Sequence, residues 1–195
     1  MLYLVRHGET VWNAAGRYQG RLDSPLTERG RAQADAVGWL LAKTVRASER
    51  KLRSYVSPAD RARETAAIMA RHVPLDSIDD ARLGAVTAGS WDGMTEPEIE
   101  KENPGILDGA GTLDLFFRAP DGERFEAVSD RVADWLKNCQ APAVIVSHGL
   151  ILRIVRGLHL GMSRPEMLAF TMKQDAICVL DDGAARIVEN DPPAR

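Results

Sequence analysis

The sequence alternates short apolar segments with longer stretches in which apolar residues recur every three or four positions. The clearest apolar segments are Leu2 to Val5 and Ala143 to Val146, and a weaker one covers residues 52–56. Segments of this length are typical of buried strands. The helical periodicity is clearest over residues 27–44 and 125–139. This alternation predicts an α/β protein built from βα units, in which helices pack on a sheet.

Capping and turn residues predict where several elements begin and end. Ser57-Pro58-Ala59-Asp60 fits a capping box with the serine as N-cap, and Thr95 with Glu98 fits another. Asp182-Gly183 lies between two apolar segments and predicts a hairpin. Residues 105–122 contain four glycines and little periodicity, so a loop is expected there. One domain is expected for the whole chain, residues 1–195, because domains commonly contain about 150 residues.

The composition argues against several classes of protein. The formal net charge is −3 and the isoelectric point is about 5.8, whereas dedicated nucleic-acid binders carry a basic excess. Two cysteines, Cys139 and Cys178, are too few for a disulfide framework or a cysteine zinc site. The apolar segment before Arg6 is too short for a signal-peptide core or a membrane span. We therefore expect a soluble, cytoplasmic protein that binds neither nucleic acid nor a membrane.

Histidines and arginines follow three of the predicted strands. Arg6 and His7 end the first strand, Arg61 lies in the first turn of the helix after the second, and His148 follows the most apolar strand. Ligands of α/β proteins collect at the carboxyl ends of parallel strands, so these side chains are expected to converge. Two guanidiniums, two imidazoles and the N-termini of the following helices would form a site for an anion such as phosphate.

A metal site is the other common use of two histidines. Zinc or iron needs a third ligand, usually a carboxylate or a cysteine. Neither His7 nor His148 lies in a ligand spacing such as His-Glu-x-x-His, and their neighbours are cationic. We therefore expect no metal ion and no other cofactor. His72 and His159 have no motif around them and are expected to be structural.

Motifs that span most of the chain occur in the order found in a known family. They are Leu4-Val5-Arg6-His7-Gly8-Glu9-Thr10, Trp12-Asn13, Gly20, Ser24-Pro25-Leu26-Thr27-x-x-Gly30, Gln33-Ala34, Ser57-Pro58-x-x-Arg61-Ala62-x-x-Thr65-Ala66, Gly89-x-Trp91-x-Gly93 and Ser147-His148-Gly149. This set resembles the histidine phosphatase superfamily, also called phosphoglycerate mutase-like. The resemblance implies a three-layer α/β/α domain with a central, mostly parallel sheet.

The resemblance also implies a role for each matching residue. His7 would be the nucleophile and would carry the phosphoryl group as phosphohistidine. Arg6 and Arg61 would grip the phosphoryl oxygens, and His148 would stabilise charge in the transition state. Supporting contacts to phosphate or substrate are expected from Asn13, Gln19, Gly20, Gly149 and Leu150. Two arginines beside His7 would also favour its neutral, nucleophilic form.

The chain departs from the family pattern at one position. Many members have a glutamate four residues before the first glycine of the Gly-x-Trp-x-Gly segment, where it serves as the general acid, but this chain has Ala85. Three explanations stay open. Asp92, Glu96 or Glu9 replaces the acid; the substrate has a good leaving group, such as a phenol or an acyl phosphate; or the domain binds phosphorylated ligands and barely turns them over.

The expected function is metal-independent hydrolysis of a phosphorylated small molecule. A phosphoglycerate mutase-type transfer is the alternative enzyme activity, although the mutases are longer and rely on the acid at the position of Ala85. A catalytically weak phospho-ligand-binding domain is the second alternative. Phe116 and Phe117 are expected to be core anchors or part of a lid over the substrate, and a homo-oligomer is left open.

Overall fold

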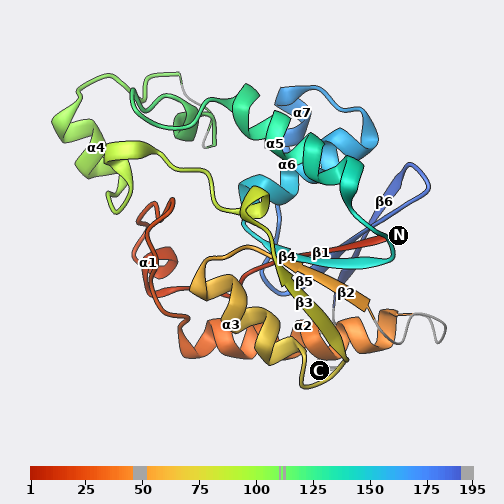
Figure 1. The fold of residues 1–195 in the computed structure, drawn as a ribbon. Helices are drawn as coiled ribbons and strands as arrows, with labels where there is room; N and C mark the ends of the chain where they lie inside the picture. Colours follow the sequence, from red (N-terminus) through yellow and green to blue (C-terminus); the bar gives the residue numbers. More distant parts are fainter. Residues whose placement is uncertain (46–51, 110, 112, 190–195) are drawn as a thin grey trace, which may run out of the picture.

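The computed structural model describes residues 1–45, 52–109, 111 and 113–189. Six strands form one sheet in the order β3-β2-β4-β1-β5-β6 (Figure 1). The strands are β1 (Leu2–Arg6), β2 (Leu52–Val56), β3 (Leu75–Asp79), β4 (Ala143–Ser147), β5 (Ala176–Asp181) and β6 (Ala184–Glu189). The helices are α1 (Val11–Ala14), α2 (Glu28–Thr44), α3 (Asp60–Met69), α4 (Glu96–Glu102), α5 (Phe125–Asn138), α6 (Gly149–Leu160) and α7 (Arg164–Ala169).

The sheet is mixed, and its larger part is parallel. β1 and β2 both pair in parallel with β4, and β3 extends this part of the sheet by pairing in parallel with β2. β5 pairs antiparallel with β1, and β6 pairs antiparallel with β5. The carboxyl ends of β1, β2 and β4 therefore lie at one edge of the sheet, as the sequence predicts.

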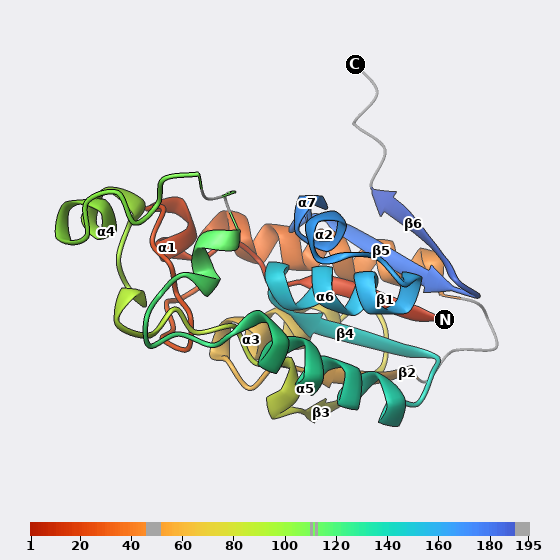
Figure 2. The same ribbon diagram turned by 90° about the horizontal axis from the view of Figure 1, so that it is seen from above.

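Helices cover both faces of the sheet (Figure 2). Successive side chains of a strand point to opposite faces, and the two hydrophobic cores follow this rule in β1. Tyr3 and Val5 are buried with apolar residues of α2 and α3, whereas Leu2 and Leu4 are buried with those of α5 and α6. Burial on both faces explains why β1 and β4 are continuous apolar segments in the sequence. The three-layer α/β/α arrangement is confirmed.

Several predicted boundaries are confirmed by local geometry. Thr27 is the N-cap of α2, and the capping box of α4 forms between Thr95 and Glu98. Asp182 and Gly183 have φ values of 44° and 72°, which suit the tight turn between two antiparallel strands.

The predicted capping box at Ser57 is wrong. α3 begins at Asp60, with Ala59 as the N-cap and no side-chain cap bond. The hydroxyl of Ser57 lies 2.7 Å from His148 Nε2, and its contact with the Ala59 N–H is longer, at 3.4 Å. The serine is directed toward the strand ends and not toward the start of the helix.

Other elements carry too little sequence signal to be predicted. β3 lies at the edge of the sheet and most of its side chains are exposed, so it lacks the apolar pattern of a buried strand. α1 and α7 have only 4 and 6 residues. In the predicted loop at 105–122, the described residues include one short 3₁₀ helix, Asp114–Phe117.

Two loop segments, one after β1 and one before α4, join beyond the carboxyl ends of the strands (Figure 1). The N–H of Tyr18 donates to the carbonyl of Met94, and the N–H of Gly93 donates to the carbonyl of Tyr18. Arg17 donates to both carboxylate oxygens of Glu98, at 2.8 and 2.9 Å. These contacts make the two segments a single wall over the strand ends. None of the described helices is both long and apolar enough to cross a membrane.

Candidate active site

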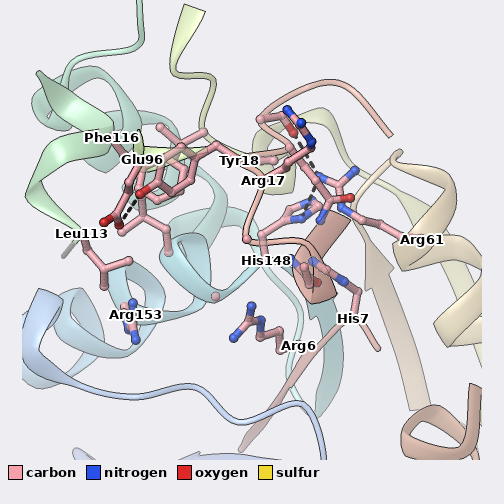
Figure 3. A pocket seen from close by; sticks show the side chains of 18 residues that line it. Arg6, His7, Arg17, Tyr18, Arg61, Glu96, Leu113, Phe116, His148 and Arg153 are labelled. Carbon is pink, nitrogen blue, oxygen red and sulfur yellow. Dashed lines mark hydrogen bonds between the residues drawn. The ribbon is translucent and has the colours of Figure 1, made fainter. Parts of the chain in front are cut away.

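The strand ends surround a cavity of about 370 Å³ (Figure 3). Arg6, which ends β1, is in register with Ser147, which ends β4. Parallel pairing therefore brings His7, Arg61 and His148 to the same edge of the sheet. All of the site residues expected from the sequence line the cavity: Arg6, His7, Asn13, Gln19, Gly20, Arg61, His148, Gly149 and Leu150.

His7 is held in one tautomer. Its side chain is buried, and Nδ1 lies 2.8 Å from the carbonyl oxygen of Gly8. Because a carbonyl oxygen can only accept, Nδ1 carries the proton and Nε2 keeps its lone pair. The backbone of His7 is tied down on both sides, through its N–H to the Ser147 carbonyl and through its carbonyl to Gln174 Nε2.

The loop that carries His7 packs against α2 with no room for a side chain. A Cβ on Gly8 would lie 2.3 Å from the carbonyl oxygen of Gly30, and a Cβ on Gly30 would lie 2.0 Å from that of Glu9. The N–H of Gly8 also donates to Thr65 Oγ1 of α3, at 3.0 Å. Glycine is needed at both positions for clearance, and the contacts with α2 and α3 fix the loop.

Both histidines of the cavity are held neutral. Burial, followed by the charges of Arg61 and Arg6, lowers the pKa of His7 to about 3, against the opposing effect of the Gly8 carbonyl. Burial also lowers the pKa of His148 well below its ordinary value, and the neighbouring His7, Arg61 and Arg6 add to this effect. The site thus keeps the His7 imidazole neutral at neutral pH, with its single proton on Nδ1.

These lowered pKa values predict that acid destabilises the fold. Between pH 6.5 and about 3, the unfolded chain binds a proton on His7 that the folded chain does not bind. The free energy of unfolding should therefore fall as the pH falls through this window, by up to about 1.4 kcal/mol per pH unit for each such histidine. Urea unfolding of the wild type and His7→Gln between pH 7.5 and 4.5 measures this slope.

The His7→Gln slope is expected to be shallower than the wild-type slope. His72→Gln removes an imidazole that pairs with Asp35 outside the cavity, so the comparison isolates the buried site. Equal pH slopes in the wild type and His7→Gln would contradict the buried, neutral state of His7.

Arg61 is anchored by the loop in front of it. Its side chain is almost fully buried, and its terminal nitrogens donate to the carbonyls of Gly20 and Leu22 and to the carboxylate of Asp23, at 2.9 to 3.0 Å. Arg6 has a single hydrogen bond among the described residues, from Nη1 to the Met172 carbonyl. The Nε atoms of both arginines are buried without a partner. The cavity thus presents guanidinium groups that an anion can satisfy.

His148 is hydrogen-bonded through both ring nitrogens. Nδ1 lies 3.3 Å from Arg61 Nη2, which can only donate, so Nδ1 accepts and Nε2 carries the proton. Nε2 donates to the hydroxyl of Ser57. The ring of His148 stands edge to face against His7, with 5.2 Å between the ring centroids. The Ser57 contact explains why this serine does not cap α3.

The remaining predicted residues supply polar groups around the cavity. Asn13 accepts from Gln174 Nε2 and from the N–H of Thr10. Gln19 accepts from the hydroxyl of Ser24. Gly149 and Leu150 lie in the first turn of α6, where helix N–H groups lack partners within the helix. The positive end of α6 therefore adds to the positive potential of the cavity.

The cavity wall has no carboxylate at the position where the family places its acid. Ala85 itself lines the cavity. Asp92 accepts from Thr87 Oγ1 and the N–H of Ala88, at 2.6 and 2.8 Å, and Glu9 accepts from Thr27 Oγ1. Neither of these two carboxylates lines the cavity. Glu96 does line it, and accepts a 2.5 Å hydrogen bond from Tyr18.

Glu96 and Tyr18 lie far from His7 within the cavity. In Figure 3 they form the opposite wall, together with Phe116 and Leu113. Burial and Glu96 raise the pKa of the Tyr18 hydroxyl. Of the two phenylalanines expected as anchors or lid, Phe116 lines the cavity, and the buried Phe117 packs on Phe125.

Sequence reasoning missed several cavity residues. They are Gly16, Arg17, Tyr18, Val86, Leu113 and Arg153. Arg153 lies on α6 four residues after Gly149 and therefore on the same helix face. The four-residue spacing could have predicted Arg153 as a cavity residue, but arginine is so common in this chain that its position alone is weak evidence. The described residues contain no cluster of three or more His, Cys, Asp or Glu side chains that could hold a metal ion.

Comparison with known proteins identifies the family. The profile of the histidine phosphatase superfamily (branch 1) matches residues 2–188. The chain is 38% identical to "Probable phosphoglycerate mutase GpmB" of Escherichia coli over 172 residues, which cover 83% of this chain and 75% of that relative. The protein therefore belongs to the histidine phosphatase superfamily.

Solved structures share its fold. The alpha-ribazole phosphatase of Shigella flexneri superimposes with a TM-score of 0.75 at 26% identity, covering 97% of this chain and 96% of that one. The mycobacterial glucosyl-3-phosphoglycerate phosphatase Rv2419c, solved with VO3, superimposes with a TM-score of 0.73 at 26% identity, covering 100% and 99%. The six-stranded sheet with helices on both sides is thus a phosphoglycerate mutase-like fold.

Proposed function

We propose that this protein is a metal-independent phosphatase that hydrolyses a phosphorylated small molecule through a phosphohistidine on His7. The observation that carries the proposal is the free Nε2 of a buried, neutral His7 in a cavity lined by Arg6 and Arg61. Relatives with this fold include named phosphatases of small phosphorylated molecules. Phosphoryl transfer depends mainly on positioning and charge stabilisation, and both are supplied here by protein groups.

In the first step, the lone pair of His7 Nε2 attacks phosphorus and the bond from phosphorus to the ester oxygen breaks. Arg6, Arg61 and the first N–H groups of α6 hold the phosphoryl oxygens and stabilise their charge. The N–H of His148 Nε2 donates to the hydroxyl of Ser57 and can turn to a phosphoryl oxygen instead. The leaving oxygen departs with the electron pair of the broken bond and, where it leaves as an alkoxide, takes a proton from solvent water.

In the second step, water attacks the phosphorus of the phosphohistidine. The bond from phosphorus to nitrogen breaks, its electron pair returns to Nε2, and the water proton passes to solvent or to the released phosphate. His7 is regenerated in its starting tautomer because Nδ1 keeps its proton against the Gly8 carbonyl. No metal ion enters either step.

Ala85 predicts that the rate depends steeply on the leaving group. An alkoxide needs a proton as it leaves and a phenolate does not, and positioned proton transfer contributes about 10²- to 10⁴-fold. In the presence of a chelator, the enzyme should therefore hydrolyse aryl and acyl phosphates at least about 10²-fold faster than alkyl phosphates. Release of inorganic phosphate from matched aryl, acyl, alkyl and phosphoramidate substrates measures this preference and tests the proposed function.

An installed acid should change that preference selectively. Ala85→Glu is expected to raise alkyl phosphate turnover and to leave aryl turnover nearly unchanged, and Ala85→Gln is the uncharged control of similar size. Equal wild-type rates on alkyl and aryl phosphates would mean that another acid acts, and Glu96→Gln would then be the first variant to make. Absence of turnover on every substrate would favour a phospho-ligand-binding domain.

Phosphoglycerate mutase activity is the second candidate, favoured by the name of the 38% identical relatives. A mutase would return the phosphoryl group of His7 to a second hydroxyl of its substrate and would release little inorganic phosphate. Measuring isomerised phosphoglycerate beside released phosphate distinguishes the two activities.

A further inference from the structure

Four arginines line the cavity, and they differ in how their charges are balanced. Arg17 is paired with Glu98 and Arg61 with Asp23. Arg6 and Arg153 have no carboxylate partner among the described residues. Arg6 belongs to the phosphoryl end of the cavity, which leaves the charge of Arg153 without a role in the proposed function.

Arg153 makes no hydrogen bond or ion pair with any residue that the structure describes. Its side chain is partly buried, and its Nε atom is fully buried without a partner. Burial and the charge of Arg6 lower the pKa of Arg153 to about 10, so the guanidinium is still charged at neutral pH. A partly buried guanidinium without a counter-charge costs free energy, and an anion bound to it would offset that cost.

The position of Arg153 separates it from the reacting atoms. Figure 3 shows it across the cavity from His7 and Arg61, with Arg6 between. Arg153 and Leu113 also line a neighbouring cavity of about 710 Å³. Arg153 thus lies at the border between the two cavities.

The cavity wall that contains Glu96 and Tyr18 disfavours a second anion. Glu96 is held there by its hydrogen bond to Tyr18, and its carboxylate disfavours negative charge nearby. Phe116 and Leu113 supply apolar surface beside it. Among the described residues of the cavity, Arg153 is therefore the cation without a carboxylate partner that the part of the substrate beyond the phosphoryl group can meet.

We infer that Arg153 binds a second oxyanion of the substrate, a carboxylate or a second phosphate, at the end of the cavity remote from His7. The inference rests on the proposed function, because it takes the phosphoryl group at His7 as the first anion. It narrows the substrate class to phosphorylated molecules that carry a further negative charge. Arg153 then acts as a specificity residue and touches no reacting atom.

The test uses non-hydrolysable phosphonates, so that binding is measured without turnover. Phosphonoalkanoic acids with one to five methylene groups are each compared with the corresponding carboxamide, which has the same shape and no charge. Isothermal titration calorimetry gives the dissociation constants, with inorganic phosphate as the probe of the His7 end alone. Alkylene bisphosphonates of the same lengths distinguish a phosphate from a carboxylate as the second group.

At one chain length or more, the wild type is expected to bind a doubly anionic probe at least about tenfold more tightly than its carboxamide. Arg153→Gln should reduce this preference to within about twofold while changing the affinity for inorganic phosphate by less than about threefold. Arg153→Lys, which keeps the charge, should retain part of the preference. Arg156→Gln is the matched control, because Arg156 lies on the same helix, stacks on Phe170 and lies outside the cavity lining; it should retain the full preference.

The inference and the proposed function fail in different ways. Equal binding of the anionic and carboxamide probes to the wild type, or a preference that survives Arg153→Gln, would overturn the second anion site alone. The comparison of anionic with carboxamide probes needs only the wild type, so it tests the inference even if a variant does not fold. If no phosphorylated substrate is hydrolysed but the Arg153-dependent preference for doubly anionic probes is present, the phosphatase proposal fails and the second anion site is supported. Failure of inorganic phosphate and all phosphonates to bind would overturn both.

Discussion

His7→Ala is expected to abolish the phosphoenzyme and to reduce phosphatase activity by about 10⁴-fold or more. Removing the nucleophile leaves only the binding and charge stabilisation of the cavity, and the residual rate of such variants is small. Brief incubation with a ³²P-labelled aryl phosphate followed by an alkaline quench measures the label. In the wild type the label should be stable in base and lost in acid, which is the behaviour of phosphohistidine.

His72→Ala is the control variant for the labelling experiment, because His72 pairs with Asp35 and lies outside the cavity. It should be labelled like the wild type. Label that persists on His7→Ala, or label on the wild type that survives acid, would show that another residue carries the phosphoryl group.

Arg61→Ala is expected to reduce kcat/KM by about 10²- to 10³-fold, and Arg63→Ala by less than about twofold. Arg61 is 2% exposed and lines the cavity, so its loss removes a charge-assisted contact to the phosphoryl group in the transition state. Arg63 points outward from the same helix, where it pairs with Asp79 and Asp60. Exposed pairs of this kind contribute little to stability.

Steady-state kinetics on one aryl phosphate measures both variants, and thermal unfolding checks that each is folded. Arg61→Lys is a second variant that keeps the positive charge but removes the planar guanidinium. The guanidinium also donates to the carbonyls of Gly20 and Leu22. Arg61→Lys should recover part of the lost rate. Similar losses in Arg61→Ala and Arg63→Ala would contradict the assignment of Arg61 to the phosphoryl group.

The fold was predictable because its central strands are buried on both faces. β1 and β4 are continuous apolar segments, and the histidines that follow them stand out because histidine is scarce in the chain. The sequence alone therefore predicts that His7 and His148 lie at one edge of the sheet. β3 could not be predicted in the same way, since its side chains are mostly exposed.

Ser57 and Arg153 show which features of the site the sequence could not predict. A serine and a proline before a helix have the same local pattern whether the hydroxyl caps the helix or contacts a distant histidine, and only the pairing of β2 with β4 decides. Arg153 is distinguished by having no carboxylate partner among the described residues. Whether an arginine has a carboxylate partner depends on how the loops pack, and the periodicity of the sequence cannot predict that.

The contact between Gly8 and Gly30 restricts where the loop behind His7 can move. The two backbones are so close that neither position could hold a methyl group, so the loop behind His7 cannot move toward α2. In a displacement reaction, something must travel between the group that leaves and the group that attacks. In the mechanism proposed above, the imidazole of His7 would stay in place, and the phosphorus atom would move from the leaving oxygen to Nε2 and then from Nε2 to the oxygen of water.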